Sequence, residues 1–329
     1  MTSIKFVRTY LLFFFLLLAV VVGFIILIPD DSLVCKEAKV REGYEWNPPD
    51  TLRIPATVEG ELIRYGKSLV VNTSFYLGPN GKIAHTSNGM NCQNCHLEAG
   101  TRFWGNNYGA VFSTYPKFRT RSGTIESIYK RINDCFERSL NGTSLDTTGK
   151  EMQAMYAYIK WLGRQVPKNN SPVGSGIVNL PFLSRAADPK NGQTVYIQKC
   201  IRCHGIKGAG LFNTDSSRYV YPPLWGDHSY STGAGLFRIS RLAGYIKYNM
   251  PLSTTGYDST QISNEEAWDV AAFINSQPRP IKEYPNDWPD ISAKPIDHPF
   301  GPYTDSFSEL QHKYGPFAVI EKAAKKSKK

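Results

Sequence analysis

Two copies of the pattern Cys-x-x-Cys-His limit what this chain can be more than any other feature of its sequence. In each copy, the two cysteines can form thioethers with the vinyl groups of a haem, and the histidine ligates the iron. A zinc site would need a second Cys or His pair at short range, which neither copy has. The sequence therefore predicts redox chemistry and two covalently bound haems c, held by Cys92, Cys95 and His96 and by Cys200, Cys203 and His204.

The N-terminal segment carries a second signal. Residues 11–28 are continuously apolar, and a helix of this length spans about 27 Å, close to the thickness of the hydrocarbon core of a bilayer. Basic residues precede the run and two aspartates follow it, which indicates a cytoplasmic N-terminus with the bulk of the chain on the periplasmic side of a bacterial inner membrane. We expect an uncleaved transmembrane anchor at residues 1–29, with a cleaved signal peptide as the alternative.

The chain is basic, with a formal net charge of +10, and four haem propionates would leave it at +6 (10 − 4). Five of its lysines lie within the last eight residues, and we expect this tail to be solvated and mobile. A basic outer surface attracts small anions. Nucleic acid is not expected as a partner, because the chain is predicted to be exported.

Composition and helical periodicity divide the rest of the chain. The predicted fold class is mainly α, with two tandem cytochrome c-type haem domains behind the anchor. Their first helices are expected at Val58–Val70 and Pro189–Cys200. Many prolines after Gln277 exclude regular helix or sheet there and predict an extended wrap. The expected parts are a stalk at residues 30–56, a haem 1 domain at 57–165, a linker at 166–185, a haem 2 domain at 186–277, and the Pro-rich wrap with its basic tail at 278–329.

An internal repeat supports two domains in tandem. Thr148-Gly149-Lys150-Glu151 and Ser263-Asn264-Glu265-Glu266 both match a capping box that opens a helix, and they are 115 residues apart (263 − 148). The helices that follow align at the same shift. The two haem motifs are 108 residues apart (200 − 92), so we expect a longer middle loop in the second domain.

The repeat also predicts a distal ligand for each haem. Met250 lies between the second motif and the final helix of its domain, and it is the only methionine in the second half of the chain. A thioether ligand raises the reduction potential of a haem, although Met250 could also be a core residue. Subtracting the shift from Met250 gives Cys135 (250 − 115 = 135), which we expect to face the iron of haem 1.

Cys135 has competitors and a simpler interpretation. Met90, Met152 and Met155 are other possible ligands of haem 1, and a free cysteine is commonly a small buried hydrophobe. As a thiolate ligand, however, Cys135 would lower the potential of haem 1 and could attack sulfur–sulfur bonds. This combination predicts oxidative sulfur–sulfur bond chemistry.

Six cations lie close to Cys135 in the sequence. Some are expected to pair with haem propionates, but guanidinium groups also match the oxygens of a sulfonate. We expect the substrate to be an oxyanion and assign its binding to Arg119, Arg121 and Arg138. The remaining cations are Lys117, Lys130 and Arg131.

With these features, the chain resembles the thiosulfate dehydrogenase family of dihaem cytochromes c over about residues 60–280. The resemblance rests on residues 91–97, 118–123, 131–142, 222–226 and 249–251, of which the segment around Cys135 is the most specific. It implies ligation of haem 1 by His96 and Cys135, ligation of haem 2 by His204 and Met250, and interconversion of two thiosulfates with one tetrathionate. Some members carry a ligating lysine before this methionine; Asn249 stands there in this chain, which leaves the preferred direction open.

Two other functions remain compatible with the sequence. One is a membrane-anchored dihaem carrier that passes electrons to a terminal oxidase without catalysis, and the other is a cytochrome subunit of a different sulfur-oxidising complex. Cys135 separates the enzyme from the carrier, because a carrier would favour Met or His at both distal positions. For the enzyme, we expect a cytochrome c or a similar redox protein as the electron acceptor.

Overall fold

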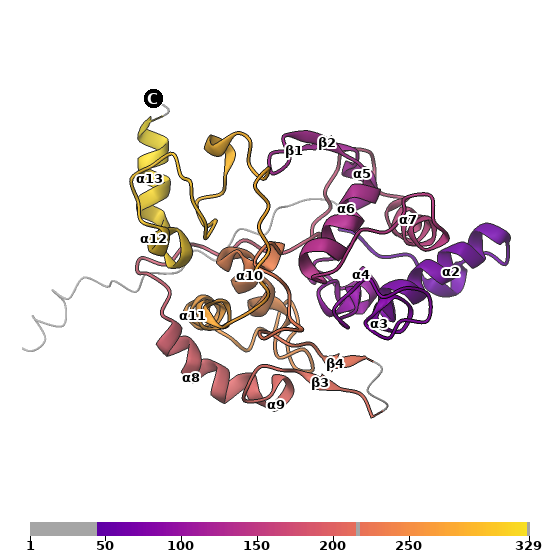
Figure 1. The fold of residues 1–329 in the computed structure, drawn as a ribbon, viewed down its shortest axis with the longest axis horizontal. Coiled ribbons are helices and arrows are strands. Elements are labelled where there is room, and N and C mark those ends of the chain that lie inside the picture. The colour runs from indigo at the N-terminus through magenta and orange to yellow at the C-terminus, as the bar shows by residue number, and fades with distance from the viewer. Residues whose placement is uncertain (1–44, 215–217, 328–329) are drawn as a thin grey trace, which may run out of the picture. The chain divides into compact units, whose positions relative to one another are not determined.

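The computed structural model describes residues 45–214 and 218–327, and these belong to one compact unit (Figure 1). The predicted anchor at residues 1–29 and most of the predicted stalk lie outside the described residues. Among the residues that are described, no helix combines the length and the apolar character needed to cross a bilayer.

The first half of the unit is mainly helical and carries one small hairpin. Strands β1 (Lys117–Arg119) and β2 (Thr124–Glu126) pair antiparallel. A π-helical turn, η3 (Cys135–Ser139), directly follows α6. The helices of this half are η1 (Thr51–Arg53), α2 (Val58–Val71), α3 (Thr73–Leu77), η2 (Cys92–Asn94), α4 (Leu97–Gly100), α5 (Val111–Thr114), α6 (Ile128–Asp134) and α7 (Lys150–Gly163).

The second half repeats this plan and adds a C-terminal segment. Strands β3 (Leu211–Phe212) and β4 (Tyr219–Tyr221) form its antiparallel hairpin. The helices are α8 (Pro189–Lys199), α9 (Ile201–His204), η4 (Gly235–Phe237), α10 (Ile239–Asn249) and α11 (Asn264–Ser276), followed by η5 (Ile291–Ala293), α12 (Glu309–Tyr314) and α13 (Phe317–Ser327). The helices predicted from Val58 and from Pro189 are thus confirmed as α2 and α8.

Each half has a core built on the same pair of crossed helices. In the first half, α2 crosses α7 where Gly66 lies against the carbonyl oxygen of Ala154. In the second half, α8 crosses α11 where Gly192 lies against the carbonyl oxygen of Asp269. A side chain at either glycine would collide with the backbone of the partner helix. The contacted carbonyls are 115 residues apart (269 − 154), which is the shift predicted from the sequence.

Only one of the two predicted capping boxes forms. The Ser263 hydroxyl accepts a hydrogen bond from the Glu266 amide at 3.1 Å, and the Glu266 carboxylate accepts one from the Ser263 amide at 2.8 Å. The box predicted at residues 148–151 is wrong, because the Thr148 hydroxyl donates to Asp146 instead and α7 begins at Lys150 without a side-chain cap. A nearby carboxylate therefore outcompetes the helix N-terminus for this hydroxyl.

The C-terminal segment differs from the prediction in its second part. Residues 278–299 contain only the short η5, as the prolines predicted. Residues 309–327 are largely helical, so the prediction of an extended wrap is wrong for them, although Lys322, Lys325 and Lys326 are exposed as expected of the basic tail. The reason is apolar packing: Phe317 and Ile320 of α13 are buried, and the Phe317 ring lies 5.6 Å from that of Trp268 in the second core.

Residues 166–185 contain no helix and pack against both halves. The Gly174 carbonyl accepts hydrogen bonds from the Trp104 amide at 2.8 Å and from Asn107 Nδ2 at 2.7 Å. Ile177 and Leu180 are buried.

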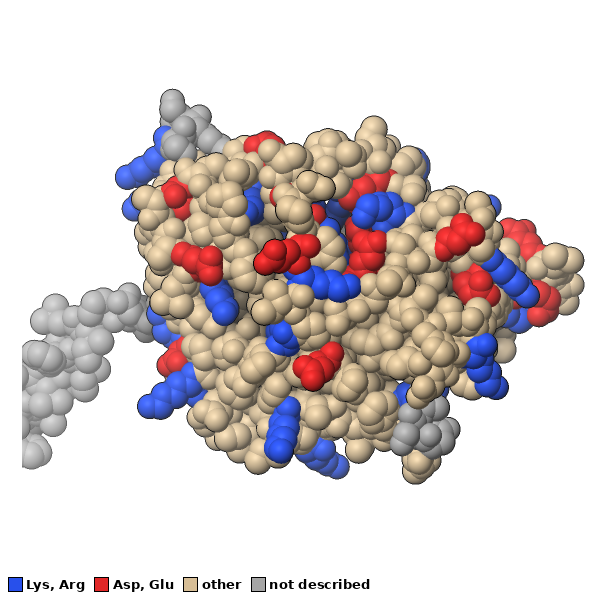
Figure 2. Space-filling model, in the orientation of Figure 1, with Lys and Arg blue, Asp and Glu red and all other residues tan. Residues whose placement is uncertain are grey.

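On the molecular face in Figure 2, acidic and basic side chains are interspersed, so the excess positive charge does not gather there into one patch.

Candidate active site

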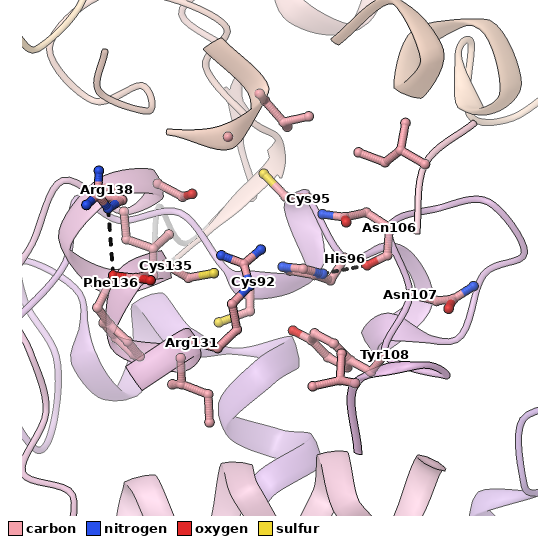
Figure 3. A pocket seen from close by; sticks show the side chains of 18 of the residues that line it. Cys92, Cys95, His96, Asn106, Asn107, Tyr108, Arg131, Cys135, Phe136 and Arg138 are labelled. Carbon is pink, nitrogen blue, oxygen red and sulfur yellow. Dashed lines mark hydrogen bonds and ion pairs between the residues drawn. The ribbon is translucent and has the colours of Figure 1, made fainter. Parts of the chain in front are cut away.

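A cavity of about 550 Å³ lies against the first Cys-x-x-Cys-His motif. Its wall includes all three motif residues and, from the turn that follows α6, Cys135 (Figure 3). The Cys135 sulfur points toward the side of the cavity where Cys92, Arg131 and His96 lie. The structure therefore brings the predicted attachment cysteines, the predicted proximal histidine and the predicted distal cysteine into one space.

The imidazole of His96 is held in one orientation. Its Nδ1 lies 2.5 Å from the carbonyl oxygen of Asn106, and its ring stacks on Tyr108 with centroids 4.6 Å apart. Burial lowers the pKa of His96 to about 4, so the ring is neutral near pH 7. With Nδ1 on a backbone carbonyl, Nε2 is left to bind a metal.

The turn that carries Cys135 has an unusual backbone. Helix α6 begins with Ser127 as its cap, whose hydroxyl accepts from the Lys130 amide at 3.2 Å. After Asp134 the helix widens into the π-helical turn, in which the Leu140 amide donates to the Cys135 carbonyl at 2.9 Å. Buried Phe136 fixes the next position in the core. Single π-helical turns of this kind are frequent at functional sites.

The methionines that compete with Cys135 lie in the core of the first half. Met90 and Met152 are buried and are not among the residues that line the cavity. Met155 is also buried but does reach the cavity wall. Ligation of haem 1 by Cys135 therefore stays a prediction, with Met155 as its nearest competitor.

The residues of the cavity fit a covalently attached haem. Two thiols and a neutral imidazole lie on one motif, and a further sulfur lies across the space. Burial raises the pKa of both Cys92 and Cys95 to about 12, which keeps these thiols protonated at neutral pH. The cavity size is also typical of cofactor sites.

Guanidinium groups gather around this cavity. Arg119 and Arg121 of the β1–β2 hairpin line it, as the sequence predicted, and so does Arg131 of α6. Burial lowers the pKa of Arg121 to about 10, yet the group remains cationic at neutral pH. Among the described residues, its buried Nε has no hydrogen-bond partner. Arg131 lies beside Cys135, whose negative charge raises the pKa of that guanidinium. Such donors suit an anionic group brought in by substrate or cofactor.

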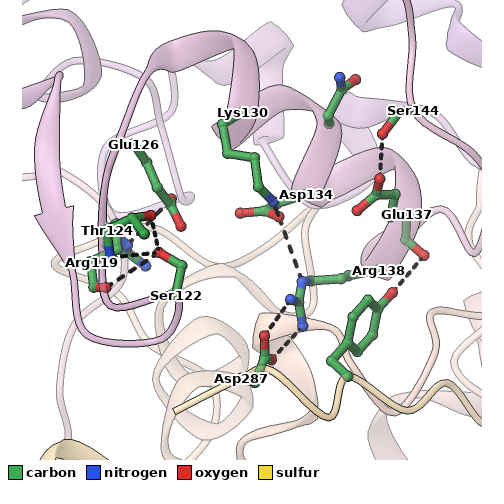
Figure 4. A network of polar contacts seen from close by, with 12 residues as sticks. Arg119, Ser122, Thr124, Glu126, Lys130, Asp134, Glu137, Arg138, Ser144 and Asp287 are labelled. Atoms are coloured by element: carbon green, nitrogen blue, oxygen red, sulfur yellow. Dashed lines mark hydrogen bonds and ion pairs between the residues drawn. The ribbon is translucent and has the colours of Figure 1, made fainter. Parts of the chain in front are cut away.

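The third predicted substrate residue, Arg138, is already paired within the chain. Its Nη1 and Nη2 each donate to the Asp287 carboxylate at 2.7 Å (Figure 4). Its Nε lies 3.7 Å from Asp134, and its guanidinium lies 3.6 Å from the centre of the Tyr284 ring. Arg138 lines the cavity as well, but both of its Nη groups are already bonded within the chain, so its predicted substrate role stays a prediction that this pairing disfavours.

The second half contributes cavity residues that the sequence did not single out. Arg241 of α10 lines the cavity and donates from Nη1 to Asn179 at 3.1 Å. Burial lowers the pKa of Arg241 to about 10. Arg238, one turn earlier, also lines the cavity but is paired with Asp297. The local sequence carries no signal for these residues, because their approach depends on the packing of the two halves.

The second motif is arranged like the first. His204 Nδ1 lies 2.9 Å from the Pro222 carbonyl oxygen, and burial lowers the pKa of this histidine. Met250 directly follows α10 and, like Cys200 and Trp225, is partly buried and packs against the core of the second half. The position of Met250 is compatible with its predicted role, which stays a prediction.

Asn249, next to Met250, is fully buried and fully hydrogen-bonded. Its Nδ2 donates to the carbonyl oxygens of Trp104 at 3.1 Å and Tyr245 at 2.9 Å. Its Oδ1 accepts from Arg102 Nε at 3.1 Å. The side chain in this position therefore ties the two halves together.

Comparisons with known proteins agree with this arrangement of two motifs. The family model for the SoxA/TsdA cytochrome c domain matches residues 82–167, and the cytochrome c model matches residues 189–278. Similar proteins include the thiosulfate dehydrogenases of Psychrobacter arcticus (38% identity, 74% of this chain and 72% of the relative) and Allochromatium vinosum (38%, 72% and 85%). Among solved structures, the as-isolated thiosulfate dehydrogenase (TsdBA) of Marichromatium purpuratum is similar, with a TM-score of 0.66 and 32% identity over 72% of this chain and 50% of that one.

Proposed function

The chain belongs to the thiosulfate dehydrogenase family, and from this premise we propose that it interconverts two thiosulfates and one tetrathionate. It is a cytochrome c-type oxidoreductase with two covalently bound haems c. In the proposed reaction, His96 and Cys135 ligate haem 1, where the sulfur chemistry takes place. His204 and Met250 ligate haem 2, through which electrons leave.

One observation carries this proposal: the Cys135 sulfur shares a cavity with the first haem motif and with several arginines. When bound, the two haems would together take up two electrons, one each, with haem 2 receiving its electron through haem 1. The Cys135 thiolate can form a sulfur–sulfur bond with the outer sulfur of thiosulfate as two electrons are withdrawn, which leaves a Cys135–thiosulfonate. A second thiosulfate then attacks the outer sulfur of the adduct, releases tetrathionate and restores the Cys135 thiolate.

The arginines have two tasks in this scheme. Arg119, Arg121 and Arg131 bind the sulfonate oxygens, so that two anions can meet despite their mutual repulsion. Arg131 also lies beside Cys135, so a sulfonate that it binds is held next to the reacting sulfur.

The environment of Met250 favours a constant ligand at haem 2. The adjacent Asn249 uses its amide for three hydrogen bonds to Arg102, Trp104 and Tyr245. It therefore has no spare group to replace Met250 on the iron. Thioether ligation keeps the potential of haem 2 high, which suits the transfer of electrons to a cytochrome c or a similar acceptor.

We also propose that the chain acts on the periplasmic side of the inner membrane, tethered by the N-terminal anchor. The apolar run at residues 11–28 and the charges at its two ends support this location. A membrane-bound position would keep haem 2 close to the acceptors of a respiratory chain.

Steady-state assays of the purified dihaem protein test the reaction. Thiosulfate with an artificial electron acceptor measures the oxidative direction, and tetrathionate with a reduced donor measures the reverse. We expect turnover in at least one direction and its loss in Cys135→Ala. A wild-type protein that exchanges electrons with the artificial acceptor and with the reduced donor, but turns over neither thiosulfate nor tetrathionate, would instead be the non-catalytic carrier.

A further inference from the structure

A segment that follows the second haem domain reaches back to the turn that carries Cys135. This segment, residues 282–289, is called the strap below. Its Asp287 carboxylate receives both Nη groups of Arg138, which lies three residues after Cys135 in the same π-helical turn. The pair is largely shielded from solvent, with 8% of the Arg138 side chain and 19% of the Asp287 side chain exposed. A bidentate pair in such a place fixes geometry as well as charge.

The strap also satisfies the backbone of the same turn. Lys282 Nζ donates to the carbonyl oxygens of Glu137 and Gly142, each at 2.9 Å. The Tyr284 hydroxyl donates to the Glu137 carbonyl at 3.2 Å. The end of a helical turn leaves its last carbonyls without partners inside the helix. Two of these bonds therefore satisfy Glu137 within the π-helical turn, and the third holds the chain just after it at Gly142.

The other end of the strap holds the hairpin with the substrate arginines. The Trp288 amide donates to the Arg121 carbonyl at 2.6 Å, and the Trp288 ring centre lies 5.7 Å from the Arg121 guanidinium. Pro289 lies over Gly123, where an added Cβ would come within 2.6 Å of the proline ring. Gly123 has a φ of +65°, which few other residues adopt without strain. The hairpin is therefore shaped to accept the strap.

We propose that the strap positions the reactive sulfur of Cys135 relative to Arg121, with Asp287 as the central positioning residue. This inference rests on the proposed function, in which Cys135 is the ligand and reacting group of haem 1. The strap touches the π-helical turn at three points and the arginine hairpin at two, whereas it lies beyond residues 82–167 and 189–278, which match the two family models. Asp287 acts through Arg138 and does not itself contact the substrate.

Asp287→Asn in the full-length dihaem protein is the direct test. The amide keeps the size of the side chain but places a donor against one arm of the Arg138 guanidinium. We expect kcat for thiosulfate to fall by about tenfold to a hundredfold, because small misplacements of a reacting group have effects of this size. The low-spin electron paramagnetic resonance signal of haem 1 should become heterogeneous, while the haem 2 spectrum stays unchanged. Asp287→Glu should recover part of kcat and of the haem 1 signal.

The matched control is Glu283→Gln, which removes the same charge from the same strap at an exposed position. It should leave both kcat and the haem 1 signal at wild-type values. Asp287→Asn added to Arg138→Gln should cause no further loss, because each variant breaks the same pair. If Asp287→Asn does not yield a folded protein, Lys282→Met removes only the two backbone bonds and should give the same spectral change with a smaller loss of kcat.

Two outcomes would overturn the role of the strap alone. One is that Asp287→Asn and Lys282→Met match Glu283→Gln in kcat and in the haem 1 signal. The other is that they lower the melting temperature without changing either readout, as a merely structural contact would. Failure of the proposed function is seen in the wild type: a haem 1 without thiolate ligation, or no turnover of either sulfur compound, would overturn both proposals.

Discussion

The two haem domains use one scaffold and differ in what surrounds the end of one helix. Helix α6 ends at Asp134 and α10 ends at Asn249, and the predicted distal ligand, Cys135 or Met250, is the next residue in each case. In the first domain the chain continues into a π-helical turn over an arginine-lined cavity. In the second, Met250 packs against an apolar core beside a neutral, fully bonded Asn249.

The comparison separates structural features that both domains share from features that surround only one of the two haem sites. The crossed helices, the motif and the histidine held by a backbone carbonyl are common to both domains. Among the described residues, the predicted thiolate ligand, the arginine-lined cavity and the strap contacts are found around the haem 1 site alone, although Arg241 and the strap come from later in the chain. The two domains therefore differ around one helix terminus while the crossed helices of their cores are alike.

The largest expected effect comes from making the first domain like the second. Cys135→Met should keep haem 1 six-coordinate and raise its reduction potential, because a thioether donates less charge to iron than a thiolate does. Thiosulfate oxidation should fall by a factor on the order of 10³ or more, as expected when a reacting group is lost. Steady-state kinetics and a redox titration of haem 1 measure the two effects. A variant with wild-type activity would show that the thiolate has no chemical role.

Removal of the distal ligand from the second domain should have a smaller effect. In Met250→Ala, haem 2 should lose its thioether signature and its potential should fall, so that transfer to the acceptor slows while thiosulfate still reduces haem 1. Rapid mixing with thiosulfate, followed at the absorbance of each haem, separates the two steps. An unaltered haem 2 spectrum would mean that another residue ligates this iron.

The arginines should affect binding more than the chemical step. A charge-assisted hydrogen bond contributes about 1.5–3 kcal/mol, so Arg121→Gln should raise KM for thiosulfate by about tenfold or more. Lys160→Gln, at an exposed position on α7, is the charge-matched control. If Arg119→Gln, Arg121→Gln and Arg131→Gln all keep the wild-type KM, the anion binds elsewhere.

The shared scaffold predicts equal costs in the two domains. Gly66→Ala and Gly192→Ala should each destabilise the protein by about 1–3 kcal/mol, because the new methyl group meets backbone of the partner helix. Gly301→Ala, at an exposed position where an added Cβ makes only an ordinary contact with the Tyr303 ring at 3.7 Å, is the control. Denaturant unfolding followed separately at each haem measures these losses. A loss in only one domain would show that the two crossings are not equivalent.

Short-range patterns predicted most of the scaffold and part of the site. The two motifs, the starts of α2 and α8 and the Ser263 cap depend on neighbours within a few residues. The repeat of 115 residues between the domains predicted Cys135 as the counterpart of Met250, because two copies of one fold are expected to keep the distal ligand at the same position. Thr148 was assigned wrongly because Asp146 competes for its hydroxyl, an outcome that propensity alone does not resolve.

The rest depends on contacts between distant parts of the chain. Arg138 looked like a substrate ligand because its partner, Asp287, lies 149 residues later. Arg241 reaches the cavity only because α10 packs against the first half. Helix α13 was overlooked because its lysines masked the apolar pair Phe317 and Ile320, which are buried in the second core.

The strap has a consequence for how the molecule matures. Asp287 lies 195 residues after Cys92 (287 − 92) and well after Cys203, so a growing chain contains both haem-attachment motifs before it contains the strap. Covalent loading with haem uses the motif cysteines, whereas the proposed positioning of Cys135 uses contacts from the last part of the chain. Full pigmentation of a preparation is therefore no measure of its active fraction, and a truncated product would share the colour of the finished enzyme without its turnover.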